Sequence, residues 1–414
     1  MIATIRGGRL SGTIRAVTSK SCAHRLLICA ALSDAPTEVE IETINADIEA
    51  TARCLNALGA EVKRTESGYR VAPADVSAAG QARLDCGESG STLRFLLPVT
   101  ALYPRGSHME LTGSDRLPER PNTALTEAMR LHGAAVSADF VPLTVEGPMK
   151  SGRYELPGNI SSQYISGLLF ALPLLEGDSQ IRFTTEVESG SYIDLTLAAL
   201  RVFGVSVQAV SGGYDIPGGQ VFRSPGVVRA EGDWSNAAFW LAARALGSDI
   251  QVTGLDPDSA QGDRAVMRVL EEMRGADGKL VGCRIDAADI PDLVPVLAVA
   301  ATQAAGETVF VNAGRLRIKE CDRLHAMREN LTKLGACVEE TEDGMIIRGR
   351  TALHGAEVDS FNDHRIAMAM AVAATVAEGE IVIRDAGAVA KSYPSFYRDF
   401  ISLGGVADLN EREA

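Results

Sequence analysis

The feature that most constrains the fold is a helix-end signature that recurs six times along the 414 residues. In each copy an amphipathic helix pattern ends in a glycine that is followed by alanine or valine. Successive copies lie 74, 71, 71, 60 and 70 residues apart. Glycine is the usual residue just beyond a helix end, because it adopts positive φ without penalty. The six copies therefore predict a repeated supersecondary unit. The glycines are Gly59, Gly133, Gly204, Gly275, Gly335 and Gly405.

A second series of segments runs in step with these glycines. Each segment begins with small, polar or charged residues and continues into a stretch too apolar for a surface helix. Strand patterns at 180–187, 307–314 and 379–386 lie between them. The unit is interpreted as β-α-β-α-β-β, repeated six times, three to a domain, since one core rarely grows beyond about 300 residues. The apolar segments are 19–32, 87–102, 161–175, 232–246, 290–304 and 362–376.

The charge and the cysteines narrow the class of protein. A net charge of −14 argues against nucleic acid or an anionic membrane as the main partner. The longest apolar runs, such as 366–377, are shorter than a membrane span, and we expect no leader peptide. Seven cysteines without a CxxC pair indicate a reducing compartment, so we expect a cytoplasmic protein. We expect residues 407–414 to be a solvated tail.

Basic residues fall at or near helix starts, although the chain as a whole is acidic. A helix N-terminus attracts anions by only ~0.3–1 kcal/mol, and charge-assisted bonds from Arg and Lys are stronger. This placement predicts a small ligand with several negative charges. The alternative is that these residues only cap buried helices or stay solvated at the surface. The basic residues are Lys20, Arg25, Arg94, Arg120, Lys319, Arg323, Arg365 and Lys391.

Two short motifs suggest how an anion is bound and a proton moved. Ser161, Ser162 and Gln163 open one apolar segment and offer uncharged donors to a phosphate, although serine is also a common N-cap. Glu320 lies between Lys319 and Arg323, and Asp292 opens another segment. Carboxylates near cations can transfer protons, but Glu320 could also be a favourable acid of a first helical turn.

Other chemistries are poorly supported. The chain has no GxxxxGK[ST] loop, no GxGxxG fingerprint and no HExxH motif. Cys321 and His325 have the i,i+4 spacing of a metal-binding pair, but without further ligands such a pair usually reflects helix packing.

The order of motifs along nearly the whole chain resembles the 5-enolpyruvylshikimate-3-phosphate (EPSP) synthase family. The motifs are SKSCAHR, GESGSTLR, RLPERP, SSQY, SYIDLT, IPD, IKECDR, NDHRIAM and AKSYPSF. The resemblance implies an α/β fold of two domains, each with three β-α-β-α-β-β units. It places a shikimate-3-phosphate-binding domain at 19–230 and a discontinuous second domain, carrying acid, base and phosphoenolpyruvate-clamp residues, at 1–18 and 231–414.

The resemblance also implies roles for individual residues. Lys20, Asp292 and Glu320 would be catalytic, with Glu320 protonating the methylene carbon and Asp292, beside Lys319, helping to deprotonate the 5-hydroxyl. No metal or organic cofactor is implied. Shikimate 3-phosphate would contact Lys20, Ser21, Arg25, Ser161, Ser162, Gln163, Ser189, Tyr192, Asp292 and Lys319. Phosphoenolpyruvate would contact Lys20, Gly90, Arg120, Gln163, Arg323, Arg365 and Lys391.

The implied reaction moves the enolpyruvyl group of phosphoenolpyruvate to shikimate 3-phosphate, on the route to chorismate and the aromatic amino acids. We expect a monomer, and the family is the target of the inhibitor glyphosate. One departure is Glu88, which stands where many family members have asparagine and would repel the phosphoenolpyruvate carboxylate unless it turns away or pairs with Arg94 or Arg120.

Two rival functions are weighed against this one. UDP-N-acetylglucosamine enolpyruvyl transferases usually carry a reactive cysteine in the region of residues 110–121, where this chain has none. A non-catalytic, anion-binding paralogue would be expected to lose acidic or clamp residues, and all of them are present.

Overall fold

A computed structural model describes residues 1–410. The chain divides into two compact units, each with its own hydrophobic core. Unit 1 combines Met1–Val17 with the chain from Gly232 onward, and unit 2 is Thr18–Glu231. The chain passes from unit 1 to unit 2 after Val17 and returns after Glu231, and each of these points lies one residue from the domain boundary that the resemblance implies. The roles assigned to the two domains stay predictions.

Unit 2 contains three four-stranded sheets, with strand orders β14-β3-β5-β4, β6-β7-β9-β8 and β10-β11-β13-β12. In each sheet the first pair is parallel and the other two pairs are antiparallel. The strands are β3 (Thr37–Glu40), β4 (Glu61–Arg64), β5 (Gly68–Ala72), β6 (Gln81–Asp85), β7 (His108–Thr112), β8 (Ala135–Val136), β9 (Leu143–Glu146), β10 (Arg153–Leu156), β11 (Ser179–Phe183), β12 (Gln208–Val210), β13 (Gly213–Ile216) and β14 (Val227–Arg229).

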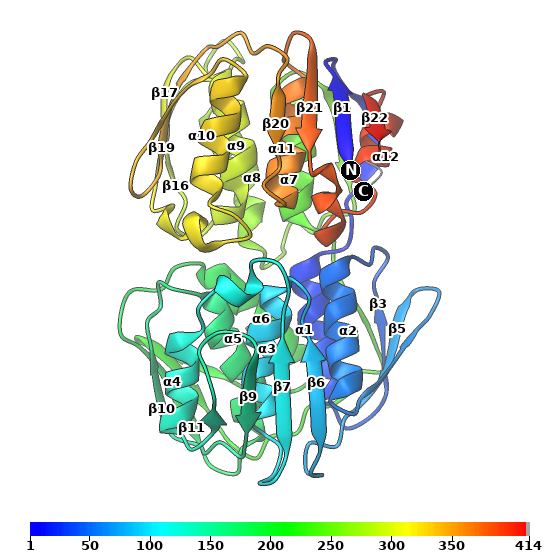
Figure 1. The fold of residues 1–414 in the computed structure, drawn as a ribbon, viewed down its shortest axis with the longest axis vertical. Helices are drawn as coiled ribbons and strands as arrows, with labels where there is room; N and C mark the ends of the chain where they lie inside the picture. The colour runs from blue at the N-terminus through cyan, green and yellow to red at the C-terminus, as the bar shows by residue number, and fades with distance from the viewer. Residues whose placement is uncertain (411–414) are drawn as a thin grey trace. The chain divides into compact units, whose positions relative to one another are not determined.

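Unit 1 contains two sheets of the same kind, β16-β17-β19-β18 and β20-β21-β1-β22, and a parallel pair, β15-β2. The N-terminal strand β1 lies between β21 and β22, so both ends of the chain complete one sheet (Figure 1). The strands are β1 (Ile2–Arg6), β2 (Ser11–Arg15), β15 (Asp249–Thr253), β16 (Arg284–Asp286), β17 (Gly306–Val311), β18 (Cys337–Glu340), β19 (Met345–Gly349), β20 (Glu357–Asp359), β21 (Glu380–Arg384) and β22 (Val406–Asn410).

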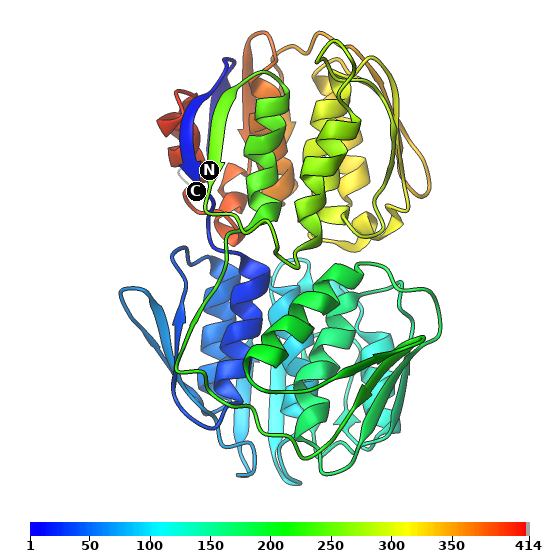
Figure 2. The ribbon, with the colours of Figure 1, turned by 180° about the vertical axis from the view of Figure 1, so that it is seen from behind.

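Helices fill the interior of each unit, with the sheets outside them (Figures 1 and 2). All six apolar segments are helices as predicted, and every residue of α9 and α11 is buried. In unit 2, α3 packs on α5, and α6 packs on α1 and α5; in unit 1, α7, α9 and α11 pack together. The helices are α1 (Lys20–Ala31), α2 (Ala46–Ala57), α3 (Gly90–Thr100), α4 (Thr123–Leu131), α5 (Ser162–Ala171), α6 (Gly190–Val202), α7 (Trp234–Ala245), α8 (Val266–Glu272), α9 (Val294–Thr302), α10 (Arg323–Lys333), α11 (His364–Ala374) and α12 (Phe396–Ser402).

The predicted α/β repeat is confirmed, with one reduced copy. Five repeats build a four-stranded sheet, and the sixth keeps only β2 and β15. After α8 the expected hairpin shrinks to an isolated bridge between Arg274 and Leu280. Two of the six predicted helix-end positions, Gly275 and Gly405, are wrong. Gly275 does not have positive φ, and α12 uses Gly404, with φ 89°, rather than Gly405.

The prediction that residues 407–414 form a solvated tail is also wrong for residues 407–410. Ala407–Asn410 continue β22 and pair with β1, because β1 would otherwise present an unpaired edge. The rest of that predicted tail, from residue 411, lies outside the described residues. Within residues 1–410, no helix is both long and apolar enough to cross a membrane.

Candidate active site

Several central helices of unit 2 begin at residues predicted to bind anions. Lys20, Gly90 and Ser162 are the first residues of α1, α3 and α5. A serine precedes each of them, and its hydroxyl accepts a hydrogen bond from the first helical turn. Serine is favoured there because its oxygen satisfies one N–H that the helix leaves unpaired. The remaining N–H groups of these turns can receive an anion.

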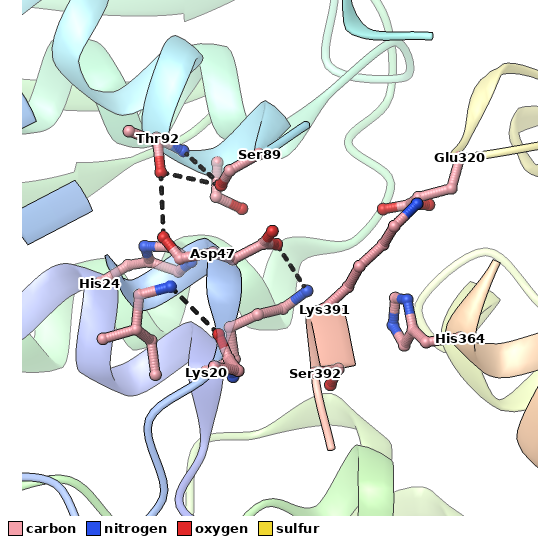
Figure 3. A network of polar contacts seen from close by, with 12 residues as sticks. Lys20, His24, Asp47, Ser89, Thr92, Glu320, His364, Lys391 and Ser392 are labelled. Atoms are coloured by element: carbon pink, nitrogen blue, oxygen red, sulfur yellow. Dashed lines mark hydrogen bonds and ion pairs between the residues drawn. The ribbon is translucent and has the colours of Figure 1, made fainter. Parts of the chain in front are cut away.

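Lys20 is paired with a carboxylate that the sequence analysis did not single out. Its Nζ lies 3.0 Å from Asp47 Oδ2, and both side chains are mostly buried (Figure 3). Asp47 belongs to α2, and its carbonyl oxygen lies 3.4 Å from the Thr92 hydroxyl of α3. The pair therefore connects the start of α1 to α2 and to the first turn of α3. No motif marked Asp47, because only the packing of α1 on α2 brings it to Lys20.

Arg94 organises the polar contacts between α3 and α5. Its NH1 donates to Gln163 Oε1 at 2.7 Å, and its Nε donates to Asn122 Oδ1 at 3.1 Å. The Gln163 amide in turn donates to the Ser91 hydroxyl at 3.0 Å. Gln163 is thereby held in one orientation, with its oxygen on a cation and its nitrogen on a hydroxyl.

Arg120 is a buried cation with an unsatisfied donor. Its residue is 7% exposed, and its Nε has no hydrogen-bond partner within the described part of the chain. Its guanidinium packs on Gly90, where an added Cβ would come within 2.9 Å of NH1. A buried guanidinium beside the start of α3 is suited to bind an anion together with the N–H groups of that helix start.

Arg25 is tied to the protein more fully than the sequence suggested. Its Nε donates to Thr196 Oγ1, and its two terminal nitrogens donate to the carbonyl oxygens of Ser21 and Tyr192. The guanidinium also lies 4.9 Å from the ring centre of Phe95. Arg25 thus joins α1 to α6, and its contact with shikimate 3-phosphate stays a prediction.

The remaining residues of unit 2 that are predicted to contact shikimate 3-phosphate lie at the starts of α1, α5 and α6. Ser162 and Ser189 are buried, whereas Ser21, Ser161 and Tyr192 are partly exposed. Ser189 precedes α6 with a left-handed φ of 55°, and its side chain does not cap the helix.

Unit 1 places three carboxylates around one arginine. Arg323 NH1 lies 2.8 Å from Asp292 Oδ1, its NH2 lies 2.8 Å from Glu320 Oε2, and its Nε lies 2.7 Å from Asp363 Oδ2. The Arg323 side chain is 2% exposed, and that of Asp363 is 0% exposed. Burial lowers the pKa of Arg323, but the three carboxylates outweigh burial and hold this pKa well above its usual value. Arg323 is therefore a fixed positive centre that orients Asp292 and Glu320.

Asp363 has two functions at the start of α11. Besides pairing with Arg323, its Oδ1 accepts a hydrogen bond from the backbone N–H of Arg365 at 2.8 Å. The Arg365 side chain reaches Asp292 Oδ2 at 2.9 Å. One buried carboxylate thus contacts both of the unit 1 arginines that are predicted to bind phosphoenolpyruvate. The motif NDHR contains Asp363, but its role could not be predicted from the sequence, because it depends on the contact with Arg323.

Two lysines complete the cluster of unit 1. Lys319 Nζ lies 3.7 Å from Asp292 Oδ1. Burial lowers the pKa of Lys319 to about 8, although Asp292 opposes this shift. An amine with this pKa can accept or donate a proton near neutral pH. Lys391 donates to the carbonyl oxygen of Asn362 at 2.6 Å, so it lies beside the start of α11.

Asp263 is a further carboxyl group that sequence analysis missed. It is buried beside α7, and burial, with Asp292 nearby, raises its pKa to about 6. The aspartate itself carries no recognisable motif. Its relation to Asp292 arises from the packing of the turn at Gly262–Ala265 against α7.

The structure contains no convergent metal-binding group among the described residues. The Cys321 thiol faces Asp363 Oδ2 at 3.6 Å, while His325 lies near Glu329 and Glu340. Cys321 and His325 therefore have different neighbours.

Comparisons with known proteins agree over nearly the full length of the chain. The family model of EPSP synthase (3-phosphoshikimate 1-carboxyvinyltransferase) matches residues 5–400. The chain belongs to the EPSP synthase family. It is 43% identical to the 3-phosphoshikimate 1-carboxyvinyltransferase of Clostridium beijerinckii, over 97% of both chains. It is 41% identical to the enzyme of the same name from Clostridium kluyveri, over 98% of both chains.

Solved structures agree with this membership. The EPSP synthase of Acinetobacter baumannii superposes with a TM-score of 0.82 at 25% identity, covering 99% of this chain and 100% of that one. The enolpyruvyl transferase NikO of Streptomyces tendae, at 19% identity, shares the fold with a TM-score of 0.78 over 98% of both chains. The two-domain enolpyruvyl transferase fold expected from the resemblance is confirmed.

Proposed function

We propose that this chain transfers the enolpyruvyl group of phosphoenolpyruvate to the 5-hydroxyl of shikimate 3-phosphate and releases phosphate, in the shikimate pathway. The observation that best supports this is the pair of carboxylates, Asp292 and Glu320, on the single guanidinium of Arg323. The reaction needs one group that takes the hydroxyl proton and another that protonates carbon. A shared cation keeps both groups in place.

The proposed chemistry is an addition followed by an elimination. A proton from Glu320 adds to the methylene carbon of phosphoenolpyruvate, so that the neighbouring carbon becomes electrophilic. The 5-hydroxyl attacks this carbon, and its proton passes to Asp292 or Lys319. The tetrahedral intermediate then returns a methyl proton to Glu320 and expels phosphate. Fixed cations stabilise the negative charge throughout.

Arg120, with its unsatisfied Nε, and the start of α3 supply one anion site for phosphoenolpyruvate in unit 2. Arg323, Arg365 and Lys391 supply cations in unit 1. The contacts of shikimate 3-phosphate with Lys20, Ser161 and Ser162 belong to the same proposal. We further propose that the enzyme acts as a monomer in the cytoplasm.

Phosphate release tests the proposal, with each substrate alone and with both together. Release that needs both supports it. Release with UDP-N-acetylglucosamine instead of the shikimate acceptor would assign the sister activity. No phosphate release with either acceptor, in a folded sample, would favour an anion-binding protein, and Glu88 would then be the first residue to substitute.

A substitution then tests the acid. Glu320→Gln should lower kcat by about 10²–10⁴-fold, the usual contribution of general acid–base catalysis. Glu329→Gln is the matched control, because Glu329 lies on α10 and pairs with Lys333 rather than with Arg323. Equal activity of the two variants would contradict the assignment of Glu320.

A further inference from the structure

A continuous chain of hydrogen bonds runs through the interior of unit 2. His24 Nδ1 lies 2.7 Å from Thr51 Oγ1, and Thr51 Oγ1 lies 2.7 Å from Thr92 Oγ1. Thr92 Oγ1 donates to Ser89 Oγ at 2.8 Å. All four residues are buried. These hydrogen bonds link α1, α2 and α3, and no sequence motif indicated a role for any of the four residues.

The Thr92-to-Ser89 hydrogen bond and the number of available protons together set the direction of the other bonds. Thr92 has a single hydroxyl proton, which it donates to Ser89 Oγ at 2.8 Å, with the carbonyl oxygen of Asp47 as a more distant acceptor at 3.4 Å (Figure 3). Thr92 therefore cannot donate to Thr51, so Thr51 donates to Thr92. Thr51 has then used its own proton and must accept one from His24. His24 consequently carries its proton on Nδ1.

The other ring nitrogen supports this tautomer. His24 Nε2 is buried and has no hydrogen-bond partner within residues 1–410. The imidazole packs edge-on against Phe95, with ring centres 6.3 Å apart. A proton on Nε2 would be a buried donor without an acceptor, which is costly. A second proton would add a charge, and burial, with Lys20 and Arg25 nearby, holds the pKa of His24 well below its usual value.

The chain of hydrogen bonds ends at Ser89, next to the part of unit 2 that is proposed to bind an anion. Ser89 Oγ accepts from the Thr92 hydroxyl and from the Thr92 backbone N–H, which fixes it as the N-cap of α3. The next residue is Gly90, on which the Arg120 guanidinium packs. Ser89 thus determines where α3 starts relative to that cation. Asp47, the partner of Lys20, accepts from the same Thr92 hydroxyl through its carbonyl oxygen.

We infer that His24, neutral and protonated on Nδ1, is a positioning residue that orders the start of α3 for anion binding through Thr51, Thr92 and Ser89. The inference rests on the proposed function for the identity of the anion, which is phosphoenolpyruvate. The tautomer itself does not depend on that function. The tautomer of His24 and its positioning role for phosphoenolpyruvate can therefore be refuted separately.

Nitrogen NMR of the protein labelled with ¹⁵N-histidine tests the tautomer directly. The chain has six histidines, and the signals missing from His24→Asn identify the pair of His24. We expect a protonated Nδ1 and an unprotonated Nε2. Protonation at Nε2 would overturn the inference, whatever the enzymatic activity of the sample.

Kinetics of phosphate release tests the positioning role with two variants. His24→Leu removes the donor, whereas the amide of His24→Asn can place a donor close to the position of Nδ1. We expect His24→Leu to raise KM for phosphoenolpyruvate by about five- to tenfold, as for the loss of one ordered hydrogen bond, with KM for shikimate 3-phosphate changed less than about twofold. His24→Asn should recover most of this loss. Equal increases in both KM values, or no rescue by Asn, would overturn the role.

Thr51→Val provides a variant that does not depend on the fit of leucine at position 24. Valine keeps the shape of threonine and removes the hydroxyl that links His24 to Thr92. It should raise KM for phosphoenolpyruvate as His24→Leu does. Because the two residues act in series, the double variant should be no worse than the poorer single variant. If the fold-increases in KM of the two single variants multiplied in the double variant, the two residues would not act through one chain of hydrogen bonds.

Discussion

At the scale of single residues, the two units hold their central arginines in opposite ways. Arg323 is surrounded by Asp292, Glu320 and Asp363, whereas Arg120 has an unsatisfied Nε and packs on a glycine. A guanidinium paired with carboxylates orients those carboxylates, and one with an unused donor attracts an outside anion. This difference fits the proposal that Asp292 and Glu320 carry the acid–base chemistry and that Arg120 contacts an anion.

Gly90→Ala tests the contact with Arg120. The added Cβ would lie 2.9 Å from NH1, the end of a flexible side chain, so Arg120 must move while the fold changes little. We expect KM for phosphoenolpyruvate to rise and the urea midpoint to stay close to that of the wild type. Gly80→Ala is the control, since its Cβ meets only Met109 Cε, at 4.0 Å. An unchanged KM in Gly90→Ala would contradict the role of Arg120.

His24 should make the stability depend on pH. Burial lowers its pKa in the folded state, while the unfolded chain titrates near 6.5. Below about pH 6.5 only the unfolded chain takes up this proton, so the stability contribution, complete above that pH, is lost as the pH falls. His24→Asn should flatten the decline by up to about 1.4 kcal/mol per pH unit. Urea midpoints from about pH 7 to 5 measure this, and parallel curves would refute it.

At the scale of elements, the functional side chains are held by helix starts. Asp363 caps α11 and also pairs with Arg323, so one residue connects the beginning of a buried helix to the charged cluster. Asp322 caps α10 in the same way, but its ion pair with Arg317 is considerably more exposed. Asp363 and Asp322 differ chiefly in burial, so substituting each of them compares the stability contribution of a buried capping aspartate with that of a more exposed one.

We expect Asp363→Ala to lower the free energy of unfolding by about 3–5 kcal/mol, because the guanidinium of Arg323 loses a buried partner. Asp322→Ala should cost only about 1 kcal/mol, the usual value of an N-cap. Asp363→Asn keeps the cap and should fall between these values. Urea unfolding measures all three, and equal losses at positions 363 and 322 would contradict the argument.

At the scale of the whole molecule, the two units differ in how the chain forms them. Unit 2 is continuous, and all of its sheets and its core come from Thr18–Glu231. Unit 1 is assembled from both ends, since β1 lies between β21 and β22, and β2 pairs with β15. The N-terminal segment is thus structural for unit 1.

Fragments test this difference. Residues 18–231 alone should unfold cooperatively in urea, because no strand of unit 2 comes from elsewhere. Residues 232–414 alone should not fold, since the sheet β20-β21-β1-β22 would lack an inner strand. Joining residues 1–17 through a flexible linker, or adding them as a peptide, should restore folding. Cooperative unfolding of 232–414 alone would contradict the prediction.

The sequence by itself determined the repeat, the buried helices and the residue types at their starts, because hydrophobic periodicity and capping act over a few residues. It did not predict the reduced sixth repeat, nor β22, whose partner β1 is at the other end of the chain. The partners Asp47, Asp363 and Asp263, and the relay from His24 to Ser89, were decided only by the tertiary structure. A side chain far along the chain becomes a neighbour only when helices pack, and no local pattern records that packing.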